Sequence, residues 1–379
     1  MGRDQSTRRD AVIDGWRGIS VLMVIVGHLF AYRAKGLYPI DALNALGLSL
    51  GSRSFAIISS LGTLGVCFFF MISGYLITTL LVAEERKRDR VSLKAFYVRR
   101  VFRIMPAFYV YVLAVYLLGS AGLLQVGDEA VLRSSLYICN FSGFSCSWWL
   151  AHTWSLAVEE QFYLVWPMLF VFAAGARRSI AIALLAGLFF GSLFFAPLAS
   201  FIYIMVGVVV ALFVGLRERL AAIDPRLVWL CLATLIVLPA APRIVTVVME
   251  PMQPVISAVV MFGTVLGKPS DVLPAILRNG WLNKIGLVSY SLYLWQQLSL
   301  APAIWGGAVT GADVLYGFGD IAWAAAFVPF AIASYFLIEQ PLLAVGRVIS
   351  RRITERGPET RAAGIPVSPA NNEEIAKGK

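Results

Sequence analysis

The stretch DGWRGISVLMVIVGHLF, from Asp14 to Phe30, contains the features that decide the fold. Its second part, from Ile19 onward, is an apolar run typical of half a membrane span, yet the stretch carries ionisable side chains. An ionisable group in hydrocarbon is costly, so each is expected to have a partner or a function. Helical geometry places Asp14, Arg17 and His28 on one stripe, with Arg17 and His28 about 16 Å apart along the axis. We therefore predict a membrane-spanning helix with one polar face.

The rest of the chain has the same apolar character. The 379 residues are 59% hydrophobic and 14% charged, whereas soluble domains are about 45–50% apolar and about 25% charged. Apolar stretches of about 20 residues recur, and each can span a bilayer as a helix. We predict an all-α polytopic membrane protein of about ten transmembrane helices in one domain, residues 1–349. The polar segment 350–379 is predicted to be a disordered cytoplasmic tail.

The net charge of +10 indicates membrane topology rather than a nucleic-acid partner. If the N-terminus is cytoplasmic, five of the 32 Lys and Arg residues fall in outside segments, namely Arg33, Lys35, Arg53, Arg133 and Arg243. The other 27 (32 minus 5) then lie in inside segments or at span ends. This asymmetry follows the positive-inside rule. We predict that both termini are cytoplasmic, that the protein lies in the inner (cytoplasmic) membrane, and that it binds no nucleic acid.

A second stretch, AHTWSLAVEEQFYLVWP, places a carboxylate inside a span at Glu159. A buried carboxylate needs a cation or a hydrogen-bond donor. Arg17 and the basic segment after residue 84 are candidate cations, and His28 or His152 is a candidate donor. A purely structural ion pair that holds the bundle together is the alternative.

The stretch FYVRRVFRIMP, from Phe96 to Pro106, begins in an inside segment, residues 84–103, which we predict to be a loop. Arg100 and Arg103 are three residues apart, with Arg99 beside them, and aromatic residues are interleaved. Clustered arginines can bind phosphates through paired hydrogen bonds. They also suit anionic lipid head groups. The pattern therefore leaves a phosphorylated cofactor and membrane lipids both open.

Three further patterns are less specific. Ser73 and Gly74, within LGVCFFFMISGYLITTLL, favour close packing of helices. Cys139 and Cys146 lie in one outside segment, where a disulfide is possible in an oxidising compartment, although the spacing does not decide it. No metal is expected, because the two histidines lie on different spans and no Cys/His cluster is present.

Taken together, these blocks resemble one family, the acyltransferase 3 integral membrane proteins. The opening DG-x-RG, with a histidine eleven residues after its arginine, is similar to the family's first helix. The family's other motifs follow in order as GVCFFFMISGYLIT, FYVRRVFRIMP, HTWSLAVEEQFYLVWP, SYSLYLWQQ and IEQPL. Two positions depart from the pattern: Cys67 stands where Asp or Ser is common, and no proline follows Gln296 and Gln297.

The resemblance implies an O-acyltransferase that takes an acyl group, usually acetyl, from acyl-CoA. The acceptor would be a hydroxyl of a carbohydrate or lipid-linked molecule, such as a surface polysaccharide, lipopolysaccharide or lipo-oligosaccharide. It implies His28 as general base, with Glu159 and Arg17 as further catalytic residues. The residues implied for the donor are Arg99, Arg100, Arg103, Ser73 and Tyr75. Enzymes of envelope glycan biosynthesis are possible partners.

A proton-coupled transporter or flippase of a glycan or lipid-linked intermediate is the alternative function. It would use His28, Glu159 and Glu339 as a proton relay across the bundle. Transporters of this kind often contain inverted repeats and broken helices in both halves. The sequence shows no such symmetry, which favours the acyltransferase.

Overall fold

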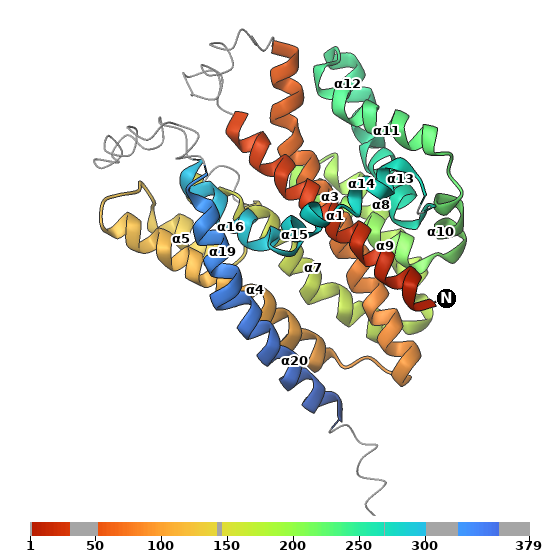
Figure 1. Ribbon diagram of the computed structural model, residues 1–379, viewed down its shortest axis with the longest axis horizontal. Helices are drawn as coiled ribbons and strands as arrows, with labels where there is room; N and C mark the ends of the chain where they lie inside the picture. Colours follow the sequence, from red (N-terminus) through yellow and green to blue (C-terminus); the bar gives the residue numbers. More distant parts are fainter. Residues whose placement is uncertain (1, 31–51, 142–145, 269, 301–324, 356–379) are drawn as a thin grey trace, which may run out of the picture.

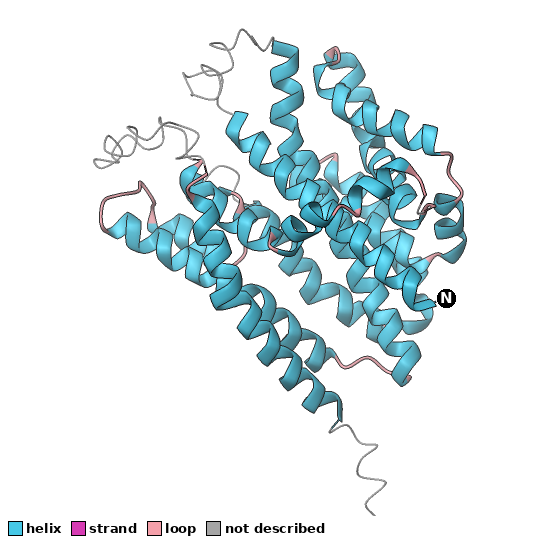
Figure 2. Cartoon of the chain, in the orientation of Figure 1, coloured by secondary structure: helices cyan, strands magenta, loops and turns pink. Residues whose placement is uncertain are grey.

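The computed structural model describes residues 2–30, 52–141, 146–268, 270–300 and 325–355. Within these ranges the chain is built of helices and connecting loops, without a strand (Figure 2). The helices are α1 (Gly2–Phe30), α3 (Ser52–Arg88), α4 (Leu93–Ser120), α5 (Asp128–Ser135), α6 (Trp148–Ala151), α7 (Thr153–Phe172), α8 (Arg177–Ser192), α9 (Ala199–Leu212), α10 (Val214–Ala221), α11 (Pro225–Val237), α12 (Arg243–Met249), α13 (Gln253–Leu266), α14 (Val272–Leu277), α15 (Gly280–Leu287), α16 (Ser289–Ser299), α19 (Phe327–Ser334) and α20 (Gln340–Glu355). This architecture is that of an all-α membrane protein.

The expected count of ten spanning helices is not confirmed. Six helical stretches of the described chain are long and apolar enough to cross a membrane: Ala11–Leu29, Arg53–Arg88, Leu93–Ser120, Ala174–Ser192, Arg243–Leu266 and Phe327–Glu355. A seventh is possible if α9 and α10, which meet at a bend of 97°, form one span. Other apolar stretches are short or divided. For example, α15 and α16 are separated at Val288, and α11 has only 13 residues.

The basic segment after residue 84 is helical, so its prediction as a loop is wrong. Helix α3 continues to Arg88 and α4 begins at Leu93, which leaves only residues 89–92 as a connection. The Ser92 side chain caps α4 by accepting a hydrogen bond from the Ala95 backbone N–H at 3.3 Å. Arginine, lysine and glutamate are good helix formers, so a charged helix end is physically reasonable. Arg99, Arg100 and Arg103 therefore have fixed positions within about the first three turns of α4.

Glycines allow α3 and α9 to approach closely, as the sequence predicts for Ser73 and Gly74. A Cβ atom on Gly74 would lie 2.0 Å from the backbone oxygen of Ile204. On the facing helix, a Cβ atom on Gly207 would lie 2.3 Å from the backbone oxygen of Met71. Small residues at such a crossing let two backbones meet, which is how membrane helices gain packing energy.

The basic helix ends gather on one side of the bundle. The start of α1, the α3–α4 connection and the end of α20 all lie toward the lower right of the view, and the end of α1 lies at the upper left (Figure 1). This arrangement agrees with the positive-inside rule. That this side faces the cytoplasm stays a prediction.

Two smaller predictions concern the ends of the described ranges. Helix α20 extends to Glu355, so the predicted boundary at residue 349 falls inside a helix, while residues 356–379 lie outside the described chain. Cys139 and Cys146 form a disulfide. Since disulfides persist in oxidising compartments, this bond agrees with placing the segment outside the cytoplasm.

The α3–α9 crossing gives a test of the packing. We expect Gly74→Ala to lower the free energy of unfolding by about 1–3 kcal/mol, because the added methyl group overlaps the backbone of α9. Thermal unfolding of the detergent-solubilised protein measures the change. Gly187→Ala is the matched control, since a Cβ atom there meets nothing within 4 Å. Equal stability of the two variants would contradict the crossing.

Candidate functional site

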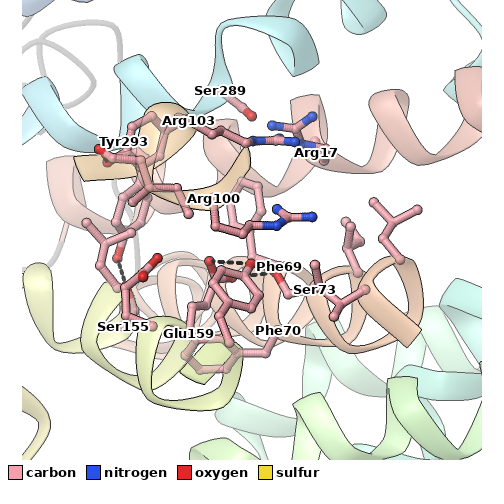
Figure 3. Close-up of a pocket in the computed structure, with 18 of the residues that line it drawn as sticks. Arg17, Phe69, Phe70, Ser73, Arg100, Arg103, Ser155, Glu159, Ser289 and Tyr293 are labelled. Atoms are coloured by element: carbon pink, nitrogen blue, oxygen red, sulfur yellow. Dashed lines mark hydrogen bonds between the residues drawn. The ribbon is translucent and has the colours of Figure 1, made fainter. Parts of the chain in front are cut away.

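A pocket lies among α1, α3, α4, α7 and α16 (Figure 3). Its volume is about 940 Å³, which includes the open space at its mouth. Three cations and two carboxylates line it: Arg17, Arg100, Arg103, Glu159 and Glu160. Hydroxyl groups line it as well, from Ser73, Ser155, Tyr163, Ser289, Tyr290 and Tyr293. Helices far apart in sequence thus bring five charged groups and six hydroxyl groups to one cavity.

Glu159 is held by two hydroxyl groups. Ser73 donates a hydrogen bond to one carboxylate oxygen, with 2.7 Å between Ser73 Oγ and Glu159 Oε1. The hydroxyl of Tyr163 lies 3.2 Å from the other carboxylate oxygen and 3.0 Å from Ser73 Oγ. Ser73 comes from α3 and the other two residues come from α7, so the carboxylate links two helices. These donors supply what a buried carboxylate requires.

The three arginines lie around this carboxylate. Arg100 stacks its guanidinium over the Tyr163 ring, 5.1 Å from the ring centre. Arg17 forms an ion pair with Asp14 at 3.6 Å, one turn away on α1. Figure 3 shows the Arg17 and Arg103 guanidinium groups side by side, near enough for their charges to repel. An anionic ligand between them would relieve this repulsion.

His28 lies outside the lining of this pocket. Its ring meets Trp148 edge-on, with 5.8 Å between the ring centres, and the Gln296 side chain lies beside it. Nδ1 of His28 and Oε1 of Gln296 are buried and have no hydrogen-bond partner among the residues that the structure describes. A ligand or a water bound beside His28 could supply these atoms with hydrogen-bond partners.

Residues on three helices show where His28 lies relative to the pocket. On α16, Tyr293 lines the pocket and Gln296, about one turn further along, lies beside His28. On α7, Ser155 lines the pocket and its hydroxyl contacts the Tyr293 hydroxyl at 2.5 Å. On α1, Arg17 lines the pocket, and His28 is about three turns away. Tyr293 and Ser155 therefore close the end of the pocket that faces His28.

Two residues expected at the donor site do not line the inner pocket. Tyr75 is buried in a separate hydrophobic cluster, where its ring packs 5.2 Å from that of Phe262. Arg99 forms an ion pair with Glu84 at 3.0 Å, toward the basic end of the bundle. Apart from His28, the other predicted residues share the pocket: Arg17, Ser73, Arg100, Arg103 and Glu159.

The structure adds residues that sequence reasoning misses. Glu160 lines the pocket together with its neighbour Glu159, although helical geometry turns the two side chains about 100° apart. A second cavity of about 1270 Å³ shares Arg100 and Arg103 with the pocket and is also lined by Arg347 and Arg351 of α20. The i, i+4 spacing of the last two is the signal in the sequence that could have found them.

The described residues contain no group of three or more His, Cys, Asp or Glu side chains that could hold a metal ion. The pocket brings together carboxylates, guanidinium groups and hydroxyls, and the imidazole of His28 lies beyond Tyr293 and Ser155. Such groups can bind an anion and can accept or donate a proton.

Comparison with known proteins agrees with the sequence motifs. A family model described as an acyltransferase domain, acyltransferase 3, matches residues 10–339. The peptidoglycan O-acetyltransferase OatA of Listeria monocytogenes is 33% identical over 168 residues, which are 41% of this chain and 23% of that protein. A putative peptidoglycan O-acetyltransferase of Bacillus subtilis, YrhL, is 30% identical over 191 residues, 46% of this chain and 26% of that protein. The matches thus span about a quarter of these relatives. No solved structure matches the chain.

The hydrogen bonds around Glu159 can be tested by removing one hydroxyl group. We expect Tyr163→Phe to lower the free energy of unfolding by about 1–3 kcal/mol, because the buried carboxylate loses a donor. Tyr75→Phe is the matched control: its hydroxyl is also buried but has no partner in the described chain, so stability should stay the same. Thermal unfolding in detergent compares the two. If Tyr75→Phe cost as much as Tyr163→Phe, the assignment of the donor would fail.

Proposed function

The chain belongs to the acyltransferase 3 family, and from that premise we propose that it is a membrane O-acetyltransferase. It transfers an acetyl group from acetyl-CoA to a hydroxyl of a carbohydrate-containing acceptor of the cell envelope. The family membership confirms the resemblance that the motifs predict. The observation that carries the proposal is the pocket lined by three arginines and a hydrogen-bonded carboxylate. Tyr293 of this pocket lies about one helical turn from Gln296, whose side chain is beside His28.

The donor occupies the arginine-lined pocket. Acetyl-CoA carries phosphates at one end and a thioester at the other, so it requires cations at the mouth of its site and a narrow path beyond. Arg100 and Arg103 lie where the pocket and the second cavity meet. Arg17 and His28 are about 16 Å apart along α1, so they act at different ends of the site, Arg17 on the donor and His28 where the acceptor hydroxyl meets the thioester. Arg17 therefore binds the donor, and the thioester lies at the end closed by Tyr293.

His28 acts as the general base. Its imidazole takes the proton of the acceptor hydroxyl, and the resulting oxygen nucleophile attacks the thioester carbonyl carbon. The carbon–sulfur bond then breaks, the CoA thiolate leaves with the proton from the imidazolium, and an O-acetyl ester remains. A hydroxyl bound here would supply a partner for Nδ1 of His28 or Oε1 of Gln296. This need for a partner supports an acceptor site beside His28.

Glu159 organises the donor pocket. Its described hydrogen-bond partners are Ser73 and Tyr163 rather than an imidazole. The carboxylate therefore balances the arginine charges and fixes α7 against α3. The sequence also allowed Glu159 to pair with the imidazole of His28, and the proposed role differs from that one.

The relatives support an envelope glycan as the acceptor. Two of them are named peptidoglycan O-acetyltransferases, one of them putatively. Because the matches span only about a quarter of those proteins, the names of the relatives do not establish the acceptor of this chain. The envelope glycan is therefore part of our proposal. A multi-pass protein of the inner membrane would meet lipid-linked glycans there, together with the enzymes that build them.

Removing the imidazole tests the proposed base. We expect His28→Ala to lower acetyl transfer by about 10²–10⁴-fold, the usual contribution of a general base. Membranes are supplied with labelled acetyl-CoA, and mass spectrometry of envelope glycans reports the product. Thr234→Ala, on α11 and outside the pocket, is the control. A folded His28→Ala variant with the wild-type rate would disprove the base, and wild-type protein that exports a glycan without acetylating it would instead establish the transporter.

The arginine cluster gives a separate prediction. We expect Arg103→Gln to raise KM for acetyl-CoA by roughly tenfold to a hundredfold, since it removes a charged partner of the donor phosphates. KM for the acceptor should stay the same. Arg133→Gln is the matched control, because that arginine pairs with Glu129 on α5 and does not line the pocket. A rise in KM for both substrates with Arg103→Gln would show a general loss of structure.

A further inference from the structure

The second cavity is a basic groove between the end of α3, the start of α4 and the end of α20. We define the basic groove by its cations, Lys87, Arg88, Arg99, Arg100, Arg103, Arg347 and Arg351. We propose that the α20 arginines, Arg347 and Arg351, bind the ribose phosphate of the CoA donor. This inference rests on the proposed function and names a part of the site that neither the motifs nor the relatives assign.

The charge of the groove is almost entirely positive. Seven of its lining side chains are cations, and Glu84 is its one carboxylate among the described residues. Glu84 is already engaged, because it pairs with Arg99 at 3.0 Å and accepts a hydrogen bond from the Ser92 backbone N–H at 3.1 Å. The two α20 arginines have no ion-pair partner within the described chain. Such an excess of positive charge creates a potential that attracts a polyanion.

Helix α20 is held firmly enough to present these arginines. Gly346 lies directly against Phe102 of α4, where a Cβ atom would meet that of Phe102 at 2.7 Å. Arg347 follows this contact, and Arg351 lies one turn further on, so both reach the same groove. The neighbouring Arg352 does not line it. One face of α20 thus contributes to the groove, and Arg352 on another face provides a control for substitutions of Arg347 and Arg351.

The groove continues into the inner pocket through shared walls. Leu80, Arg100 and Arg103 line both cavities. A donor whose thioester lies at the closed end of the pocket would have its nucleotide in the groove. The phosphate group on the ribose carries about −1.5 to −2 charge near pH 7 and three acceptor oxygens, so it suits two arginines better than a single one. The shared arginines, Arg100 and Arg103, are then left for the diphosphate.

The test compares CoA with 3′-dephospho-CoA, which lacks this one phosphate. The full-length protein is placed in nanodiscs of neutral phosphatidylcholine, and calorimetry measures both dissociation constants. We expect wild-type protein to bind CoA about tenfold more tightly than 3′-dephospho-CoA. We expect Arg347→Gln/Arg351→Gln to bind both equally, at the wild-type affinity for 3′-dephospho-CoA. Arg352→Gln should keep the wild-type preference, which controls for net charge on α20.

Other outcomes separate the possible failures. A double variant that keeps the tenfold preference overturns the α20 assignment and leaves the proposed function standing. A wild-type protein that binds neither CoA nor acetyl-CoA overturns the proposed donor as well. In nanodiscs with phosphatidylglycerol, a double variant that loses lipid enrichment but keeps its CoA preference would assign the groove to a lipid head group. If Arg352→Gln lost the preference for CoA to the same extent, the effect would come from the net charge of α20, and the assignment of Arg347 and Arg351 would be overturned.

Discussion

The hydrogen-bonded carboxylate of Glu159 is the constraint on which the site depends. Arginines inside a membrane bundle are costly, and several of them facing one cavity repel each other. A carboxylate fixed by Ser73 and Tyr163 lowers that cost without neutralising every cation. The pocket therefore keeps positive charge, which suits the anionic donor proposed for it. The same three residues link α3 to α7, so binding chemistry and helix packing depend on one small set of contacts.

This arrangement divides the site into two levels. In the proposed function, the arginines hold the phosphorylated donor toward the basic end of the bundle, and His28 lies beyond Tyr293 and Ser155. A small acyl group can reach past this boundary more easily than a nucleotide can. The acceptor can therefore approach His28 without displacing the donor from its arginines.

The sequence predicts much of this site and fails at identifiable points. A carboxylate in a span demands cations, and the motifs supply them, so the set Arg17, Arg100, Arg103 and Glu159 was predictable. Ser73 and Tyr75 are about 200° apart on a helix, so both could not face one pocket, and the structure places Tyr75 in an apolar cluster. The loop predicted for residues 84–103 is helical because charged residues that mark a membrane boundary are also good helix formers. The spacing along α1 predicts that Arg17 and His28 share one face of the helix. It does not predict which residues of other helices they contact.

The α20 arginines show why a charge pattern alone cannot identify a binding site. In the sequence, Arg347, Arg351 and Arg352 have the same meaning for topology, since each is a positive charge near a predicted cytoplasmic end. The i, i+4 spacing puts the first two on one face of the helix, and the packing of α20 against α4 turns that face toward the groove. The positive-inside rule explains why such charges accumulate on one side of the membrane. Helix packing also directs two of them into a cavity that continues into the inner pocket, and this placement is what supports the second, anion-binding role proposed for them.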